Sequence, residues 1–516
     1  MKIDRSAGIL LHITSLPGKY GTGTLGDEAY EFVDHIHKGG FRYWQILPVG
    51  PVSPSMCWSP YSSISSFAGN ELFISIDHLL RENWFKNKIS CDEFPEENFC
   101  NFDRARRFLR KVVILSFDEF LLHATEEENM EFNRFCLHHN SLWLDDYALY
   151  ISLVHEFNSF NWLSWKREIA IRDPETITTL NTKLAERILL VKYAQFIFFR
   201  QWKRLKDYAN SRGIRIIGDI PIYISMESSD AWINSHILDF DKINLQPNKI
   251  AGVPPDYFSE TGQLWGNPLY KWYSKSGELN EDTYQWWKKR IMHSLSLADI
   301  IRIDHFRGFE SYWSVEYGEE TAVNGEWEHG PGRPFFDRLK KETGALPLIA
   351  EDLGLITPEV KDLRDTLQLP GMKILQFAFD FNNKNEYLPH NIDEKNCVVY
   401  TGTHDNDTVN GWFYDPEFPE EHRNYVMEYL GMKEWSDFHW RIIREAYATQ
   451  ADLAVVPAQD ILGYGREFRM NTPGTIESNW TWKLTKGALT EEMMLKTGRL
   501  AGIFSRIPDK EKPDAT

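Results

Sequence analysis

Short runs of apolar residues recur along the chain, and most of them end at a polar or turn residue. Eight such runs stand out, at residues 8–13, 43–48, 215–221, 300–308, 347–352, 372–380, 397–405 and 453–460. Strands that are apolar almost throughout are typical of a parallel sheet that is buried on both faces. Helical periodicity lies between several of the runs, so the pattern predicts an α/β fold, a (β/α)8 barrel.

Two stretches are too long to be ordinary connections of such a barrel. Residues 52–183 separate the second and third runs, and within them residues 104–123 and 127–157 have helical patterns. Connections between a strand and a helix need only a few residues, so we predict a large, mainly helical inserted subdomain at 52–183. A second insertion, 225–297, follows the third run. The whole chain, 1–516, is therefore expected to be one catalytic TIM barrel domain with insertions after strands 2 and 3.

Acidic residues lie at the ends of several apolar runs. In a parallel barrel these ends share one rim, where barrel enzymes keep their chemistry. Each acid alone could be a helix N-cap in the loop that follows it. Five acidic strand ends that converge on one mouth instead favour a functional site. The residues concerned are Asp219, Asp304, Glu351, His404 with Asp405, and Gln459 with Asp460.

Arg302 and Asp304 alternate with isoleucines, so their side chains share one face of the predicted strand. By itself this alternation could be a simple ion pair at a sheet edge. Glu351, at the end of the next run, supplies a second carboxyl group. Cleavage of a glycosidic bond needs such a pair, an acid for the leaving oxygen and a carboxylate as nucleophile or base. The pair could instead bind a divalent metal, although Mg²⁺ favours more carboxylates or a phosphate ligand.

The composition narrows the range of partners. The formal net charge is −18, and phosphate binding needs clustered Lys and Arg, so we expect neither nucleic acid nor an anionic membrane surface as a partner. Aromatic residues make up 14% of the chain, including 19 Trp and 22 Tyr. They could simply fill a rich core, or they could stack on flat, apolar ligand faces such as those of sugars.

The cysteine pattern and the absence of long apolar runs bear on localisation. The five cysteines are widely spaced and form no CxxC pair, which argues against a disulfide framework or a zinc site. The first residues lack the apolar core of a signal peptide, and no run approaches the roughly 20 apolar residues of a membrane span. A cytoplasmic protein is expected.

Three of the stretches resemble the catalytic motifs of amylomaltases, the 4-α-glucanotransferases or disproportionating enzymes of the α-amylase clan. They read RIDHFRG at 302–308, AEDLG at 350–354 and GTHDNDT at 402–408. Further segments that resemble the family are SPYSS at 59–63, FAGN at 67–70, GDIPIY at 218–223, GVPPDYFS at 252–259, GQLWGNP at 262–268 and RMNTPG at 469–474. One RxD motif is weak evidence, but an ordered series of motifs from residue 5 to about 480 is specific.

The resemblance implies roles for three carboxylates. Asp304 would be the nucleophile that forms a covalent glucosyl-enzyme, and Glu351 would be the general acid and then the general base. Asp405 would hold the sugar 2- and 3-hydroxyls and stabilise the transition state. Arg302 would orient Asp304 and keep it ionised. The family retains anomeric configuration, so the carboxyl groups of Asp304 and Glu351 are expected about 5–5.5 Å apart.

The resemblance also implies a set of sugar-binding residues. His404 would bind a hydroxyl, Asp219 would contact the donor sugar, and Tyr61 would be a platform beside the scissile bond. Trp265, on a Gly- and Pro-rich lid loop, would exclude water and stack on a sugar ring, although it could instead only pin the loop to the barrel. The full substrate-binding set is Arg302, His404, Asp219, Tyr61, Asp256, Tyr257, Trp265, Asn267 and Asn471.

The function implied is transfer of an α-1,4-glucan segment to the 4-hydroxyl of another glucan or of glucose. Maltodextrins and fragments of starch or glycogen would be the substrates. No cofactor or metal is expected, because the acid, the nucleophile and the acceptor supply the reaction. Three alternatives stay open: a hydrolase of the same clan, a catalytically silent glucan-binding protein, and a metal-dependent barrel hydrolase.

Overall fold

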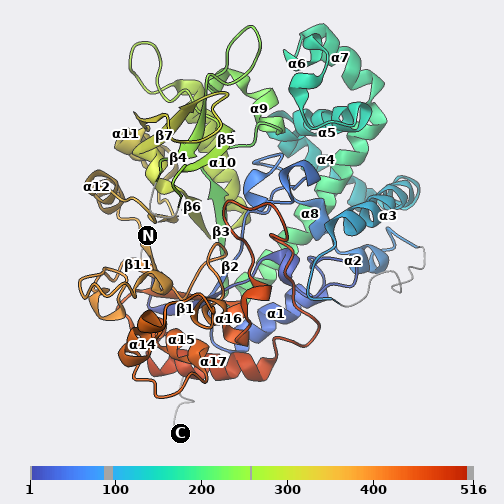
Figure 1. The fold of residues 1–516 in the computed structure, drawn as a ribbon. Coiled ribbons are helices and arrows are strands. Elements are labelled where there is room, and N and C mark those ends of the chain that lie inside the picture. The colour runs from blue at the N-terminus through green and yellow to red at the C-terminus, as the bar shows by residue number, and fades with distance from the viewer. Residues whose placement is uncertain (1–2, 87–96, 256–258, 508–516) are drawn as a thin grey trace.

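Eight parallel strands form the centre of the molecule (Figure 1). The computed structural model describes residues 3–86, 97–255 and 259–507. The strands pair side by side in the order β10-β11-β12-β1-β2-β3-β6-β9. Their bounds are β1 (Ser6–Leu10), β2 (Tyr43–Gln45), β3 (Arg215–Pro221), β6 (Ile300–Asp304), β9 (Leu348–Ala350), β10 (Gly371–Ile374), β11 (Cys397–Tyr400) and β12 (Leu453–Pro457).

The two outer strands of this sheet meet and close it. Ala350 N, in β9, donates a hydrogen bond of 2.9 Å to Pro370 O, directly before β10. The predicted (β/α)8 barrel is therefore confirmed. Within the sheet, β1 and β2 approach each other closely, and a Cβ on Gly8 would lie only 2.9 Å from Tyr43 Cβ. A larger residue than glycine would force these two strands apart.

Helices outside the barrel connect its strands, and a long helix also follows the last strand. Among the connecting helices are α1 (Asp27–Lys38), α8 (Ala185–Ser211), α10 (Glu281–Leu297), α11 (Gly332–Thr343), α12 (Pro358–Thr366) and α15 (Phe438–Ala448), and the long helix that comes after β12 is α17 (Glu491–Ile503). In α1, Phe32, Val33 and Ile36 recur at helical spacing and are buried, so one apolar stripe packs the helix onto the strands. Within the described residues, no helix combines the length and the apolar character that crossing a membrane requires.

Between β2 and β3 the chain forms a group of helices at one side of the barrel (Figure 1). The helix predicted over 104–123 is α3, and the pattern predicted over 127–157 is two helices separated by a π-helical turn at Asn140–Leu144. Helix α4 begins with a capping box in which Thr125 and Glu128 satisfy each other's main-chain N–H groups. The helices are α2 (Ile76–Arg81), α3 (Phe102–His123), α4 (Glu126–His139), α5 (Asp145–Phe157), α6 (Arg167–Ala170) and α7 (Pro174–Lys183).

A second, antiparallel sheet lies beside the barrel and was not predicted. Its order is β5-β4-β7-β8, and it combines strands that follow β3 with strands that follow β6 (Figure 1). The strands are β4 (Lys249–Val253), β5 (Gln263–Pro268), β7 (Ser311–Glu316) and β8 (Gly325–His329). These segments are only partly buried and carry many polar residues, so they give no apolar run. The 225–297 stretch thus contributes to a sheet that β6's own connection completes.

Three predicted strands are shorter than expected. β10 ends at Ile374 rather than near residue 380, because a 3-10 turn begins at Leu375. β11 ends at Tyr400, so His404 and Asp405 lie in the loop beyond it. β12 ends at Pro457, and Asp460 lies in the short helix α16 (Ala458–Leu462). The rim acids of the last strands are therefore placed by loops and helix starts rather than by strand ends.

Candidate active site

An ion-pair cluster on two neighbouring strands forms the centre of the candidate site. β3 and β6 pair in a register that sets Asp219 opposite Arg302. Arg302 Nη1 lies 2.7 Å from Asp219 Oδ2, and Arg302 Nη2 lies 2.9 Å from Asp304 Oδ1. The side chains of Arg302 and Asp219 are buried, whereas 27% of the Asp304 side chain is exposed. One guanidinium therefore holds two carboxylates, of which that of Asp304 is open to an incoming ligand.

Arg302 and Asp219 stabilise each other's charged forms. Burial raises the pKa of Asp219 to about 6, and the Arg302 guanidinium opposes that rise. Burial alone would lower the pKa of Arg302, but Asp219 and Asp304 raise it well above its ordinary value. Arg302 therefore stays a cation at the base of the site, ion-paired with both Asp219 and Asp304.

Glu351 follows β9 directly and is held by main-chain donors. His305 N donates to Glu351 Oε2 at 2.6 Å, and Leu353 N donates to Oε1 at 2.9 Å. His305 comes next after Asp304 and has a φ of 52°, in the left-handed region that side chains rarely adopt. Burial raises the pKa of Glu351 to about 8, with Arg302 opposing the rise and the negative charge of Asp304 adding to it. A carboxyl group that keeps its proton near neutral pH is suited to general acid catalysis.

Asp405 has the opposite environment. His404 Nε2 lies 3.2 Å from Asp405 Oδ2, and Asn471 Nδ2 donates to Oδ1 at 2.6 Å. Arg469 Nη2 donates to the main-chain oxygen of Asp405 at 2.6 Å. Burial by itself would raise the pKa of Asp405, but His404 and Asn471 lower it well below its ordinary value. Asp405 is therefore held as a negative charge, in contrast to Glu351, which retains its proton near neutral pH.

Tyr61 connects the ion-pair cluster to the Asp405 loop. Its hydroxyl donates to Asp219 Oδ2 at 2.8 Å. Its ring stacks on the imidazole of His404, with centroids 4.9 Å apart and planes 13° from parallel. Trp480 packs against both of these rings. The predicted platform residue thus lies among the predicted catalytic residues.

The residues predicted on the lid loop and in the strand that follows it do not all lie at the site. Trp265, in β5, is 37% exposed, and its ring meets the edge of the His305 ring at a centroid distance of 4.9 Å. It therefore lies over the turn that follows Asp304. Asn267 Nδ2 instead donates to Ile224 O at 2.8 Å, a bond that ties β5 to the segment after β3. Asp256 and Tyr257 lie outside the described residues.

Two contributing residues were missed from the sequence. Arg469 lies in a motif segment, but its contact with the Asp405 main chain had no local signal. Trp480 has a left-handed φ of 66° and reaches Tyr61 and His404 from far along the chain. An arginine two residues before the predicted Asn471 was the only available hint.

Metal ligands do not cluster in the part of the chain that is described. Among those residues, no group of three or more His, Cys, Asp or Glu side chains has a geometry that could hold a metal ion. At the site itself the neighbours of the carboxylates are Arg302, His404 and main-chain N–H groups, which neutralise or bind carboxylates rather than complete a metal shell.

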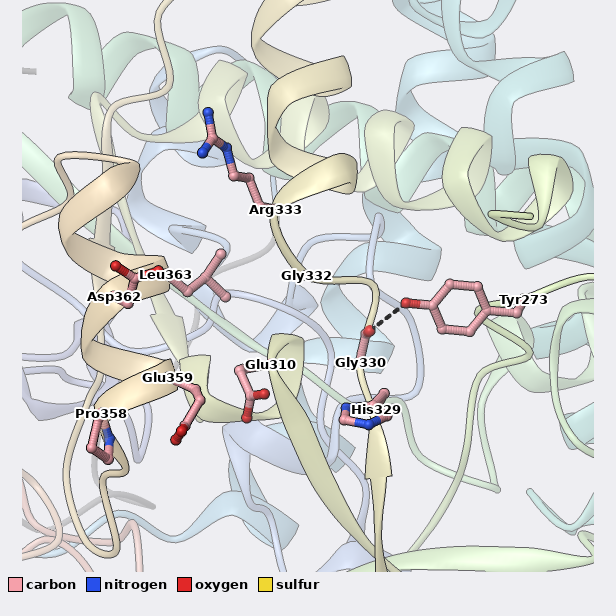
Figure 2. A pocket seen from close by; sticks show the side chains of 10 residues that line it. All are labelled: Tyr273, Glu310, His329, Gly330, Gly332, Arg333, Pro358, Glu359, Asp362 and Leu363. Atoms are coloured by element: carbon pink, nitrogen blue, oxygen red, sulfur yellow. Dashed lines mark hydrogen bonds between the residues drawn. The ribbon is translucent and has the colours of Figure 1, made fainter. Parts of the chain in front are cut away.

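A separate hollow of about 500 Å³ lies between the β7–β8 hairpin and the first turns of α11 and α12 (Figure 2). Figure 2 shows the Tyr273 hydroxyl donating to Gly330 O, at 2.7 Å, on one side of it, and Glu310 and Glu359 near each other on another. None of the predicted site residues lines it. This hollow is therefore separate from the predicted site.

A barrel whose rim pairs a proton-retaining carboxyl group with an arginine-bound carboxylate belongs to the enzymes that act on glycosidic bonds. A family model described as 4-alpha-glucanotransferase matches residues 11–490, and the chain belongs to that family.

Proteins and structures similar to this chain agree with that assignment. A 4-alpha-glucanotransferase of Clostridium butyricum is 45% identical over 506 residues, which cover 96% of this chain and 100% of the relative. One of Thermus thermophilus is 41% identical over 98% of this chain and 100% of the relative. The solved amylomaltase from Streptococcus agalactiae in complex with acarbose is 35% identical, with a TM-score of 0.90 over 98% of this chain and all of that one.

Proposed function

We propose that the chain transfers α-1,4-glucan segments by two successive displacements at Asp304, with Glu351 as acid and base. The observation that carries the proposal is the contrast between neighbouring carboxyl groups. Glu351 has a pKa raised to about 8, whereas Asp304 is ion-paired with a buried arginine. A retaining glycosidic mechanism needs one proton donor and one ionised nucleophile side by side.

In the first displacement, Asp304 Oδ attacks the anomeric carbon of the donor sugar. The bond between that carbon and the glycosidic oxygen breaks, and Glu351 gives its proton to the departing oxygen. A covalent glucosyl-enzyme results, and the released glucan leaves with a new 4-hydroxyl. Asp405, held ionised by His404 and Asn471, would bind the 2- and 3-hydroxyls and stabilise the positive charge that develops on the sugar.

In the second displacement, the 4-hydroxyl of another glucan or of glucose attacks the same carbon. Glu351, now a carboxylate, takes the hydroxyl proton, and the bond to Asp304 breaks. Water would compete as an acceptor unless the site excludes it. Trp265 lies over the His305 turn beside the nucleophile, which suits it to cover the intermediate and to stack on the acceptor sugar.

We further propose that residues 52–183 and 225–297 are insertions into a single catalytic domain of 1–516, and that the protein works in the cytoplasm. The four described cysteines, Cys57, Cys100, Cys136 and Cys397, are unpaired thiols, which supports a reducing compartment.

The test is incubation of the purified protein with maltotriose, followed by chromatography of the products. Glucose together with a ladder of longer maltodextrins is expected, and Asp304→Asn should abolish both. Glucose and maltose alone would mark a hydrolase. Turnover by Asp304→Asn within about tenfold of the unsubstituted protein would rule out Asp304 as the nucleophile, because loss of a nucleophile costs far more than that.

A further inference from the structure

One buried carboxylate holds both ends of the loop that carries Asp405. This loop, residues 402–408, joins β11 to helix α13 (Val409–Phe413). Thr401 Oγ1, directly after β11, donates to Asp460 Oδ2 at 2.6 Å. Val409 N, at the start of α13, donates to Asp460 Oδ1 at 2.9 Å. Each oxygen of Asp460 therefore binds one end of the loop.

Asp460 reaches the loop from the neighbouring strand. It lies in α16, directly after β12, and β12 pairs with β11 in the barrel. Its side chain is fully enclosed, with an exposed fraction of 1%. A carboxylate in such a place is costly to the fold unless it is fully hydrogen-bonded. Burial raises its pKa to about 7, and the bonds from Thr401 and Val409 oppose that rise.

Other contacts hold Asp405 and Asp407 within the loop. Gln376 Nε2 donates to Asp407 O at 2.8 Å, and Arg466 Nε lies 2.7 Å from Asp407 Oδ2. Arg469 and Asn471 hold Asp405 itself. These partners come from β10's connection and from residues 466–471, whereas Asp460 binds both Thr401 and Val409 from the segment that follows β12, the strand beside β11.

We infer that Asp460 is a positioning residue for the transfer reaction. By binding both Thr401 and Val409, Asp460 fixes the position of Asp405 relative to the sugar. The inference rests on the proposed function, in which Asp405 binds the 2- and 3-hydroxyls most strongly in the transition state. Asp460 itself contacts no reacting atom. Replacement of Asp460 should therefore lower kcat most for a donor whose transition state depends strongly on contacts with Asp405.

The experiment compares two donors, α-maltotriosyl fluoride and its counterpart that lacks the 2-hydroxyl on the fluorine-bearing ring. Fluoride release gives kcat and KM for each. On the full donor, Asp460→Ala should lower kcat by about 10- to 100-fold, since a misplacement of about 1 Å can cost that much, and should change KM by less than about threefold. On the deoxy donor the loss should shrink to about a third or less, because one of the hydroxyls that Asp405 binds is already missing.

Two variants serve as controls. Asp460→Asn can accept from Val409 N through its oxygen while its amide donates to the Thr401 hydroxyl, so its kcat should stay within about threefold. Asp230→Ala removes a different buried carboxylate, one that accepts from Ser66 N at 2.6 Å. Any loss that it causes should be the same on both donors.

Equal losses on both donors for Asp460→Ala, or no loss, would overturn the inference. Asp405→Asn separates this failure from failure of the proposed function. If its loss is also the same on both donors, the role proposed for Asp405 is wrong. If its loss depends on the donor and that of Asp460→Ala does not, only the role of Asp460 is wrong. Should Asp460→Ala not fold by circular dichroism, Thr401→Val removes one of the two ties and should show the same donor dependence at a smaller size.

Discussion

The two sides of the catalytic rim hold their carboxylates by different means. On the strand side, Asp304 ends β6, and its partner Arg302 lies two residues earlier on the same strand. On the loop side, Asp405 lies beyond the end of β11, and its partners Arg469 and Asn471 come from a segment far along the chain. Strand register places the first group, whereas long-range hydrogen bonds place the second. A residue in a strand is positioned by the sheet itself, whereas a residue in a loop depends on contacts with other parts of the chain.

The two sides also differ in protonation. The strand side contains Glu351, whose pKa burial raises to about 8, and the loop side contains Asp405, whose pKa His404 and Asn471 hold low in spite of burial. The difference lies in the donors. Glu351 receives two neutral main-chain N–H groups, while Asp405 faces an imidazole and an amide. Tyr61 joins the two sides through Asp219 and His404.

The largest effect is expected on the strand side, from Glu351→Gln. An amide cannot give a proton to the departing sugar, so kcat on maltotriose should fall by about 10³-fold. On α-maltotriosyl fluoride, whose leaving group needs no proton, the first displacement should be nearly unchanged. Product chromatography measures the first, and the burst of fluoride release measures the second, because steady turnover of the fluoride also needs Glu351 as the base. An equal loss on both donors would show that Glu351 is not the acid.

Arg302→Lys tests the shared cation. Lysine is a point charge and cannot bridge Asp219 and Asp304 with two separate nitrogens, so we expect a loss of about 10²-fold in kcat and about 3 kcal/mol in the free energy of unfolding. Steady-state kinetics and urea unfolding measure these losses. Lys249→Arg, in the second sheet, is a control outside the rim. Full activity in Arg302→Lys would mean that strand register alone positions Asp304.

A smaller loss is expected on the loop side, from Asn471→Ala. It removes one of the two donors to the Asp405 carboxylate but leaves His404 and Arg469, so kcat should fall by about tenfold with little change in KM. Asn471→Asp, which puts a second negative charge at the same place, should be worse than alanine. If alanine costs more than Arg302→Lys, long-range contacts matter more to catalysis than the buried cation.

Titration of Glu351 should give the smallest effect close to neutral pH, because at pH 8 about half of the molecules still keep the proton. The protonated form of Glu351 is the active one in the first displacement, so kcat/KM on maltotriose should fall as the pH rises through about 8 and should approach a tenfold fall per pH unit above it. This fall at high pH should be absent from the burst of fluoride release with α-maltotriosyl fluoride, because its leaving group needs no proton. If the burst falls in the same way, the titrating group is not the acid.

The barrel was predictable because its eight strands are mostly apolar, as a parallel sheet covered by helices requires. The antiparallel sheet was not, because β7 and β8 carry polar residues between their apolar ones, include exposed residues such as Glu326 and Trp327, and form no apolar run. The helix pattern at 127–157 was found, but the π-helical turn that splits it leaves the apolar spacing nearly intact.

The strand side of the site was predictable in the same way. Arg302 and Asp304 are local in sequence, and the alternation of residues on a strand is enough to put them together. On the loop side, the end of an apolar run placed His404 and Asp405 near the rim, but the role of Asp405 and the part of Asn471 were recognisable only from the resemblance to a family. Nothing near Asp405 or Arg469 predicts that they meet, since that contact depends on how two connections fold over the rim.

The hydrogen bond from His305 N to the Glu351 carboxyl group bears on the stereochemistry of the reaction. The nucleophile and the acid are connected through a single hydrogen bond. The main-chain N–H of His305, the residue after Asp304, donates to the carboxyl group of Glu351. The backbone turn at His305 therefore helps to set the spacing of the two carboxyl groups, together with the side-chain conformations of Asp304 and Glu351. An inverting mechanism needs room for a water molecule between the sugar and the carboxylate. A change of mechanism would thus involve this left-handed turn as well as the two side chains.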